Sequence, residues 1–513
     1  DLHLDLGRQV RHRLQETANE PHVRGSGRGE QRPLGVGRIR QLPHALGRRQ
    51  DERPLRPALG EEANQAGCPG KAFTHDQEPA PGVFRGKQPG PIGLVHAAES
   101  TDKRKRRGIG PICGRVGTTT DSDGGLESGS VPAMHVGVPK ESRPGERRVA
   151  AVPATVETMV GWGWTVEVQA DAGTEAGFPD DLFVAAGAQI VPDAAAAHDT
   201  DLVLRVGPPA LEEVGLTREN AALVGFLDPF VEADLVRALA ARNLTSVAVE
   251  AIPRTTLAQA MDALSSQANL AGYAAVLMGA QASPKLLPMM VTAAGTIPPS
   301  KALILGVGVA GLQAIATARR LGAVVHAYDI RVETKEQVES LGAKFVEAPT
   351  AEADEGGYAR EVQDDVQQRQ FEALSPHVAD SDLIVTTAQI PGRPAPLLIT
   401  PEMVATMHPG SVIVDMAAGT GGNVAGSQPD EVVEVGGVKI FGPTNLASFV
   451  PTDASRMYAR NLIAFIERLR DKETGELAFD LDDEIIGGST ITYDGRVVNP
   501  RSRQLLGMED SSA

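Results

Sequence analysis

The stretch Lys301–Arg331, KALILGVGVAGLQAIATARRLGAVVHAYDIR, predicts a strand, a glycine-rich turn, a helix and a second strand, in that order. An apolar run of strand length precedes the pattern G-x-G-x-x-G, and apolar residues at helical spacing follow it. Its three glycines are Gly306, Gly308 and Gly311. In this order they allow a tight turn, close approach of the backbone to a pyrophosphate, and close packing of helix on strand. The pattern indicates a dinucleotide-binding fold.

Residues beside the three glycines are further candidates for contact with the cofactor. Val309 and Ala310 open the predicted helix, whose free N–H groups and positive dipole end favour phosphate. Asp329 follows the second strand, where a carboxylate accepts hydrogen bonds from the adenosine ribose and repels a 2′-phosphate, so it favours NAD over NADP. Ile330 and Arg331 come next. An arginine near this position can accept a 2′-phosphate, but we interpret Arg331 as flanking the adenosine.

Composition limits the classes of function. A chain of 513 residues has room for two or three domains, and its net charge of −17 argues against a nucleic-acid partner. No apolar run reaches the length of a transmembrane helix. Residues 1–133 differ from the rest, because they are net basic, rich in Arg, Gly, Pro and His, and contain both cysteines. We interpret this segment as upstream sequence translated from a misplaced start, with Met134 the true first residue; the alternative is a disordered extension. The absence of cysteine after residue 133 fits a reducing cytoplasm.

Alternating strand and helix patterns predict two further units. Residues 134–271 are expected to form a first α/β domain without a glycine fingerprint, and residues 272–447 the dinucleotide-binding domain. A long helix at about Asp453–Leu469 and a hairpin turning at Asp494-Gly495 are expected to return to the first domain, so that residues 448–513 pack on it. The predicted fold class is α/β, with two Rossmann-like, doubly wound parallel-sheet domains, an interdomain cleft, and a discontinuous first domain.

A polar segment connects the two predicted domains. Residues 252–280, IPRTTLAQAMDALSSQANLAGYAAVLMGA, are polar in their first half, and we expect a helix only from about Leu270 to Met278. Such a segment is either a surface connection or a polar loop facing the cofactor across the cleft, and we favour the second. The candidates in it are Arg254, Thr255, Thr256, Gln259, Asp262 and Ser265.

Two other segments have the composition of ligand contacts. Residues 351–360, AEADEGGYAR, combine acidic residues, adjacent glycines and one tyrosine, which is typical of a mobile lid, the alternative being an ordinary exposed loop. Ala388 and Gln389 follow an expected strand at Leu383–Thr386, and doubly wound sheets bind ligands at the carboxyl ends of their strands.

From Met134 to about Val498 the chain closely resembles the NAD(H)-binding alpha subunit (domain I) of the proton-translocating transhydrogenases, whose fold is related to that of alanine dehydrogenase. The stretches that carry the resemblance are MMVTAAGTIPPSKALILGVGVAGLQAIATARRLGAVVHAYDIR, TKEQVESLGAKF and PRTTLAQAMDALSSQANLAGY. The resemblance implies that Arg254, Gln259 and Asp262, with Ser265 beside them, hold the nicotinamide with its ribose and phosphates.

The resemblance assigns further positions. Gly357 and Tyr358 correspond to a mobile loop that closes over bound nucleotide, and Gln370 and Gln389 to positions around the cofactor. The catalytic residues implied are Arg254, Gln259, Asp262, Ser265 and Tyr358. One departure is Gly419, where the family usually has a glutamate before Gly-Gly-Asn, so the role of that acid is in doubt here.

The implied reaction is hydride transfer from NADH on this chain to NADP⁺ on a partner subunit, coupled to proton movement across the membrane. It requires orientation and exclusion of water rather than a general acid or base, and no metal is expected. The implied partners are membrane-embedded and NADP-binding subunits and a second copy of this chain. The implied place is the cytoplasmic face of the inner membrane.

Two alternatives belong to other functional classes. A soluble amino-acid dehydrogenase like alanine dehydrogenase needs a lysine and a histidine in the first domain to bind and protonate a keto acid. Gly207 stands near the lysine position and Asp228 near the histidine position, which disfavours that activity. The other alternative is a non-catalytic module that senses NAD or serves assembly.

Overall fold

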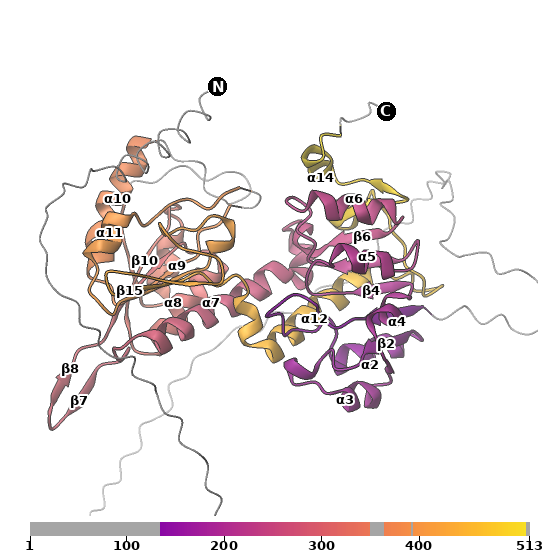
Figure 1. Cartoon of the computed structure of the whole chain (residues 1–513), viewed down its shortest axis with the longest axis horizontal. Helices are drawn as coiled ribbons and strands as arrows, with labels where there is room; N and C mark the ends of the chain where they lie inside the picture. Colours follow the sequence, from indigo (N-terminus) through magenta and orange to yellow (C-terminus); the bar gives the residue numbers. More distant parts are fainter. Residues whose placement is uncertain (1–133, 349–363, 391–392, 509–513) are drawn as a thin grey trace, which may run out of the picture. The chain divides into compact units, whose positions relative to one another are not determined.

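The computed structural model describes residues 134–348, 364–390 and 393–508. These residues form two mainly parallel sheets, each flanked by helices (Figure 1). The predicted α/β class with two Rossmann-like parallel sheets is therefore confirmed. Residues 1–133 lie outside the described ranges, so neither interpretation of that segment is tested.

The first sheet has the strand order β17-β16-β6-β5-β4-β1-β2-β3. Its strands are β1 (His135–Val138), β2 (Thr165–Gln169), β3 (Gln189–Val191), β4 (Leu202–Leu204), β5 (Ala222–Gly225), β6 (Thr245–Ala248), β16 (Thr490–Tyr493) and β17 (Arg496–Val497). The helices between them are α2 (Pro153–Gly161), α3 (Asp180–Ala185), α4 (Ala194–His198), α5 (Leu211–Leu216) and α6 (Ala233–Ala241). Strands β1 to β6 run parallel, and their order reverses between β1 and β4, which makes that point the expected ligand side.

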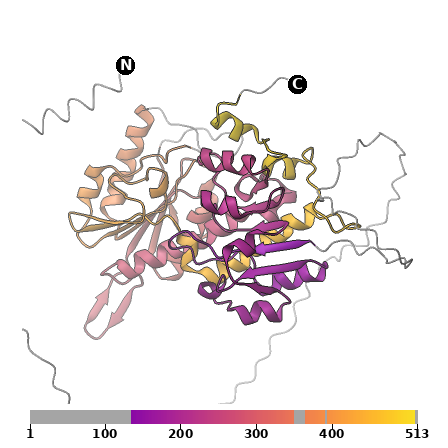
Figure 2. The ribbon, with the colours of Figure 1, turned by 45° about the vertical axis from the view of Figure 1, so that its right-hand side comes forward.

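The C-terminal segment completes this first sheet. Helix α12 (Pro451–Leu469) buries Tyr458, Phe465 and other apolar residues in the core of the sheet, and β16 pairs antiparallel with β6. Helices α13 (Glu484–Ser489) and α14 (Pro500–Leu505) flank the hairpin. The hairpin turns at Asp494 and Gly495, both with positive φ (48° and 69°), as an Asp-Gly turn requires. Figure 2 shows α12 and the hairpin among the elements of the first sheet.

The second sheet has the order β11-β10-β9-β12-β13-β15-β14, and β14 alone in it runs antiparallel to its neighbour. Its strands are β9 (Lys301–Leu305), β10 (Val324–Tyr328), β11 (Lys344–Phe345), β12 (Leu383–Thr386), β13 (Val412–Asp415), β14 (Val432–Val435) and β15 (Val438–Phe441). Its helices are α8 (Val309–Arg320), α9 (Thr334–Ser340), α10 (Asp364–Ala379) and α11 (Pro401–Thr406). The order reverses between β9 and β12, so the glycine turn after β9 lies at the switch point.

Helix α7 (Ala263–Ala282) runs from the polar segment into the second domain. It begins well before Leu270, so the predicted start of this helix was wrong. The reason is a side-chain cap, because the carboxylate of Asp262 accepts from the backbone N–H of Ser265 (2.8 Å) and from its hydroxyl (2.6 Å). Farther along, a Cβ at Gly272 would lie 2.1 Å from the carbonyl oxygen of Ala310. Only glycine lets α7 approach the first turn of α8 this closely.

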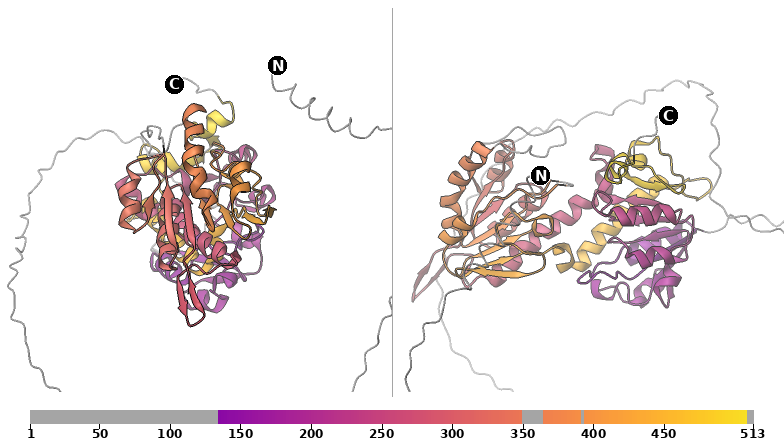
Figure 3. Two further views of the ribbon diagram at one scale, coloured as in Figure 1. Left: turned by 90° about the vertical axis from the view of Figure 1, so that its left-hand side faces the viewer. Right: turned by 45° about the horizontal axis from the view of Figure 1, so that its top comes forward.

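Two hairpins of the second domain had no sequence prediction. One is the pair β14 and β15, and the other is β7 (Met290–Thr292) with β8 (Gly295–Ile297). All six strand residues of the β7–β8 hairpin are exposed, and Figure 3 shows it standing out from the rest of its domain. No alternation of buried and exposed residues marks these strands. Across the described ranges, no helix is both long and apolar enough to cross a membrane.

Candidate functional site

A cavity of about 1210 Å³ lies at the carboxyl ends of strands from both sheets. From the second sheet, Gly306 follows β9, Asp329 follows β10 and Ala388 follows β12. From the first sheet, Asp228 follows β5 and Glu250 follows β6. The switch points of both sheets therefore contribute to one cavity, as the sequence predicted for a ligand of such folds.

The three glycines of the fingerprint have different surroundings. Gly306 has a φ of 93°, and a Cβ there would lie 2.7 Å from the hydroxyl of Thr387. A Cβ at Gly311 would lie 1.9 Å from the carbonyl oxygen of Gly306, so this position requires glycine for packing. A Cβ at Gly308 would meet no atom within 4 Å, and Gly308 lines the cavity. The backbone is thus open to a ligand at Gly308.

The start of α8 fits the pyrophosphate of a dinucleotide. Val309 and Ala310 form its first turn and line the cavity, and no side chain caps this end of the helix. The N–H groups of a first helical turn have no partner within the helix and lie at the positive end of its dipole. Together with the open backbone at Gly308, these donors form a site for a negatively charged group.

Asp329 and Arg331 form an ion pair on the cavity wall. Asp329 is 6% exposed, and its carboxylate accepts from the backbone N–H groups of Val307 (2.6 Å) and Arg331 (2.9 Å). The Arg331 side chain donates through Nε to Oδ1 (2.9 Å) and through Nη2 to Oδ2 (3.0 Å). The sequence interpretation considered the two residues separately. In the structure they are one paired unit, so the guanidinium offsets the negative charge that would repel a 2′-phosphate.

The candidates of the polar segment lie together. Arg254, Asp262 and Ser265 line both the large cavity and an adjoining one of about 270 Å³. Thr255, Thr256 and Gln259 line the smaller cavity, where the short helix η4 (Thr256–Met261) leads into the Asp262 cap of α7. Their contact with the nicotinamide remains a prediction.

The remaining candidates divide into three groups. Those that line the large cavity are Ile330, Gln370, Ala388 and Gln389, and the amide of Gln389 donates to the carbonyl of Met416 (3.0 Å). Gly311 is buried and serves packing. Gly357 and Tyr358 lie outside the described residues.

Sequence reasoning missed most of the first-domain wall of the cavity. Glu250 accepts from the N–H groups of Leu227 (2.8 Å) and Asp228 (2.6 Å) through Oε1, while its buried Oε2 has no hydrogen-bond partner. Burial raises the pKa of Glu250 to about 7, and the nearby carboxylate of Asp228 acts in the same direction. Burial also raises the pKa of Asp228, against the effect of Arg143, whose Nη1 lies 3.9 Å from Oδ2. No motif marks these acids, because the neighbours that matter lie on separate strands.

Comparison with known proteins fits this geometry. Residues 137–271 match the family model "Alanine dehydrogenase/PNT, N-terminal domain", and residues 275–500 match "Alanine dehydrogenase/PNT, C-terminal domain". The chain is 48% identical over 377 residues to the first of the proteins that make up NAD(P) transhydrogenase subunit alpha in Rhodospirillum rubrum, spanning 72% of this chain and 98% of that protein. The chain belongs to the alanine dehydrogenase/PNT family.

Other members of the alanine dehydrogenase/PNT family are similar in structure or sequence. The crystal structure of the transhydrogenase from Sinorhizobium meliloti is 44% identical, with a TM-score of 0.65, and the match covers 71% of this chain and 100% of that one. The alanine dehydrogenase of Halomonas elongata is 30% identical over 384 residues, which are 73% of this chain and 98% of that protein. The predicted resemblance to the transhydrogenase alpha subunit, with alanine dehydrogenase as a relative, is confirmed.

Proposed function

We propose that this chain is the NAD(H)-binding subunit of a proton-translocating transhydrogenase and passes hydride from NADH to NADP⁺ on a partner subunit. The observation that carries the proposal is the composition of the cavity wall. Among the described residues that line it there is neither a lysine nor a histidine, while the glycine fingerprint and the polar segment are both present. The cavity is suited to hold a dinucleotide but lacks the usual groups for protonating a keto acid.

The residues divide the work along the cofactor. Gly308 and the first turn of α8 bind the pyrophosphate, and the Asp329–Arg331 pair faces the adenosine ribose. Arg254, Gln259, Asp262 and Ser265 orient the nicotinamide end, with Asp262 itself fixed by its two hydrogen bonds from Ser265. Bound NADH supplies the hydride. The protein contributes position and a water-poor surrounding, which are the effects that such a transfer needs.

The proposal extends to partners and place. The acceptor nucleotide, NADP(H), is bound by a separate subunit, and further membrane-embedded subunits carry the proton pathway. This chain attaches to them at the cytoplasmic face of the inner membrane as a peripheral subunit, and it forms a homodimer. The similarity to a protein named as a portion of a transhydrogenase alpha subunit supports this assembly.

The decisive experiment separates orientation from binding. In Gln259→Ala we expect single-turnover hydride transfer to an added NADP-binding subunit to fall by roughly a hundredfold at saturating NADH. NADH affinity, measured by titration, should change much less, because most binding energy comes from the adenosine and pyrophosphate. Gln281→Ala, at the exposed far end of α7, is the matched control and should leave both quantities unchanged.

Three outcomes count against elements of the proposal. Weakened NADH binding with an unchanged transfer rate means that the polar segment only anchors the cofactor. No change in either quantity means that it is a connection between domains. No transfer by the unmutated protein with a competent partner favours the non-catalytic NAD-sensing role.

An alanine dehydrogenase activity is the second candidate, favoured by the 30% identity to the Halomonas elongata enzyme. At the positions that such an enzyme needs, Gly207 has no side chain to offer, and Asp228 is an acid of raised pKa. We expect no NADH formation from alanine and NAD. Turnover at the rate of a dehydrogenase would replace the proposed function.

A further inference from the structure

A carboxylate of the protein itself occupies the Arg148 guanidinium on the cavity wall. Arg148 is 9% exposed and lines the cavity, whereas Glu146 is absent from its lining. Arg148 donates to Glu146 in a bidentate pair, from Nε to Oε1 (2.8 Å) and from Nη2 to Oε2 (2.6 Å). Such a fork-to-fork arrangement is the one by which arginine binds the carboxylate of a ligand.

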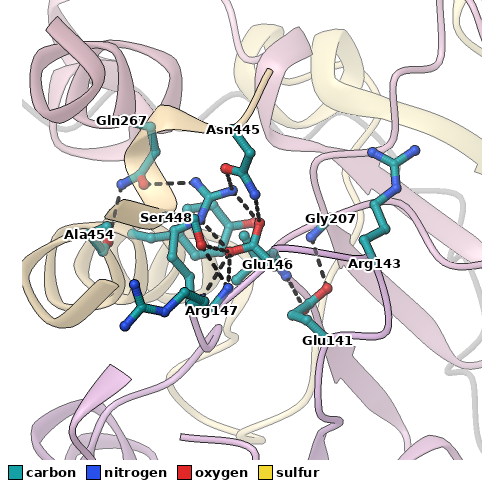
Figure 4. Close-up of polar contacts among 12 residues, drawn as sticks. Glu141, Arg143, Glu146, Arg147, Gly207, Gln267, Asn445, Ser448 and Ala454 are labelled. Atoms are coloured by element: carbon teal, nitrogen blue, oxygen red, sulfur yellow. Dashed lines mark hydrogen bonds and ion pairs between the residues drawn. The ribbon is translucent and has the colours of Figure 1, made fainter. Parts of the chain in front are cut away.

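Neighbouring groups hold this pair in place. Arg148 also donates from Nη1 to Gln267 (2.9 Å) and from Nη2 to Asn445 (3.3 Å). Glu146 accepts from the amide of Asn445 (3.0 Å) and the hydroxyl of Ser448 (3.2 Å), as Figure 4 shows for its labelled residues. These contacts lower the pKa of Glu146 despite its burial, the hydrogen bonds and charge of Arg148 being the largest favourable cause. Glu146 is thus ionised and its charge cancels that of Arg148.

The rest of the first-domain wall is acidic. Asp228 and Glu250 both line the cavity, and Oε2 of Glu250 has no partner. Arg143, 3.9 Å from Asp228, is half exposed and does not line the cavity. A small carboxylate entering here meets two acids and an arginine that is already paired.

We propose that Glu146 is a specificity-determining residue, which closes an anion subsite at Arg148 and so excludes 2-oxo acids and similar small carboxylates from the cavity. Its consequence for the reaction rests on the proposed function, since NADH bound beside an open Arg148 would be exposed to a 2-oxo acid as a wrong hydride acceptor. The closure itself is a property of the free protein and is testable without any reaction.

The test is binding of oxamate, an unreactive 2-oxo-acid analogue, to the whole chain without nucleotide. Glu146→Gln keeps the size of the side chain but replaces one acceptor oxygen by an amide and leaves the charge of Arg148 uncancelled. We expect the variant to bind oxamate at least about tenfold more tightly than the unmutated chain in an NMR titration, the factor of one charge-assisted hydrogen bond. Glu146→Gln with Arg148→Gln should lose that gain.

The neighbouring pair Arg147–Glu175 provides a matched control. Its atoms Nε and Oε2 lie 3.4 Å apart, both side chains are exposed, and neither residue lines the cavity. Glu175→Gln removes the same charge and should produce no gain in oxamate binding. A gain as large as that of Glu146→Gln would reduce the effect to net charge and overturn the proposal.

Two other results overturn it as well. One is tight oxamate binding by the unmutated chain, and the other is no gain in Glu146→Gln. Cooperative thermal unfolding shows that the variant is folded, and Glu146→Ser, which removes the carboxylate altogether, is the second test if Glu146→Gln is not. NADH titration of the same samples reports on the proposed function separately, because failure there leaves the oxamate result standing.

Discussion

The carboxyl group of Glu250 keeps its proton at a pH where most glutamates have lost theirs, because its pKa is raised to about 7 from 4.5. The folded protein therefore binds a proton that the unfolded chain releases between these two values. The contribution of Glu250 to the free energy of unfolding falls as the pH rises through this window and is constant above it.

Glu250→Gln removes this pH dependence while keeping the Oε1 acceptor for the N–H groups of Leu227 and Asp228. We expect the variant to be more stable than the unmutated chain by about 3 kcal/mol at pH 8, and by much less at pH 5. Denaturant unfolding at both pH values measures the difference. Glu212→Gln, on the exposed face of α5, should change stability by less than about 0.5 kcal/mol at either pH. Equal effects of Glu250→Gln at both pH values would contradict the assignment.

The pair Asp329–Arg331 leads to a second prediction about single residues. Repulsion between Asp329 and a 2′-phosphate amounts to about 1–4 kcal/mol at 4 Å, depending on the local dielectric, and Arg331 offsets part of it. Asp329→Ala should therefore reduce the preference for NADH over NADPH, and Arg331→Ala should increase it. Equilibrium titration of each variant with both nucleotides gives the two ratios. A change in the same direction for both variants would show that the ion pair does not set the preference.

The turn from β9 into α8 contains two glycines whose replacement by alanine should have opposite effects. At Gly308 a Cβ meets no protein atom, and φ is −80°, so Gly308→Ala should fold normally. It should weaken NADH binding by at least about tenfold, because the methyl group occupies the path of the pyrophosphate. At Gly311 the Cβ would lie 1.9 Å from a carbonyl oxygen, so Gly311→Ala should cost about 3 kcal/mol of stability. Thermal unfolding and NADH titration of both variants check the contrast, and similar behaviour of the two would refute it.

Elements with a strong local pattern were predictable from the sequence. The fingerprint strand and helix, the long helix α12 and the Asp-Gly hairpin all lie within a few residues of their expected positions. The start of α7 was not predictable from apolar spacing, because it depends on one carboxylate bonding two groups of Ser265. The pairing of Glu146 with Arg148, and of Glu250 with the backbone after β5, depends on hydrogen-bond geometry that no sequence pattern shows. The positions of the cofactor candidates followed from strand order, whereas the charge of the opposite wall did not.

Assembly of the whole molecule gives a prediction about the β7–β8 hairpin. A lone two-stranded hairpin is marginal in water, and this one exposes Met289 (61%), Val291 (69%) and Ile297 (46%). If the chain is a homodimer, we expect a second copy to cover these side chains. Val291→Asp should then yield monomers in sedimentation velocity with an unchanged fold, since the side chain is already exposed. Val432→Asp, at an exposed valine of β14, is the control and should leave the dimer intact. A dimeric Val291→Asp variant would exclude the hairpin from the interface.

Helix α7 has a consequence for which changes of chain length this protein tolerates. Asp262 at its start faces the nicotinamide side of the proposed site, and Gly272 contacts the helix that faces the phosphates. A helix advances 1.5 Å and turns by about 100° per residue, so these two positions lie about 15 Å apart in fixed rotation. One inserted residue between them would turn Asp262 away from the cavity or Gly272 away from Ala310. Loops elsewhere can lengthen without such an effect, but the ten-residue interval from 262 to 272 can vary neither up nor down while the same cofactor spans it.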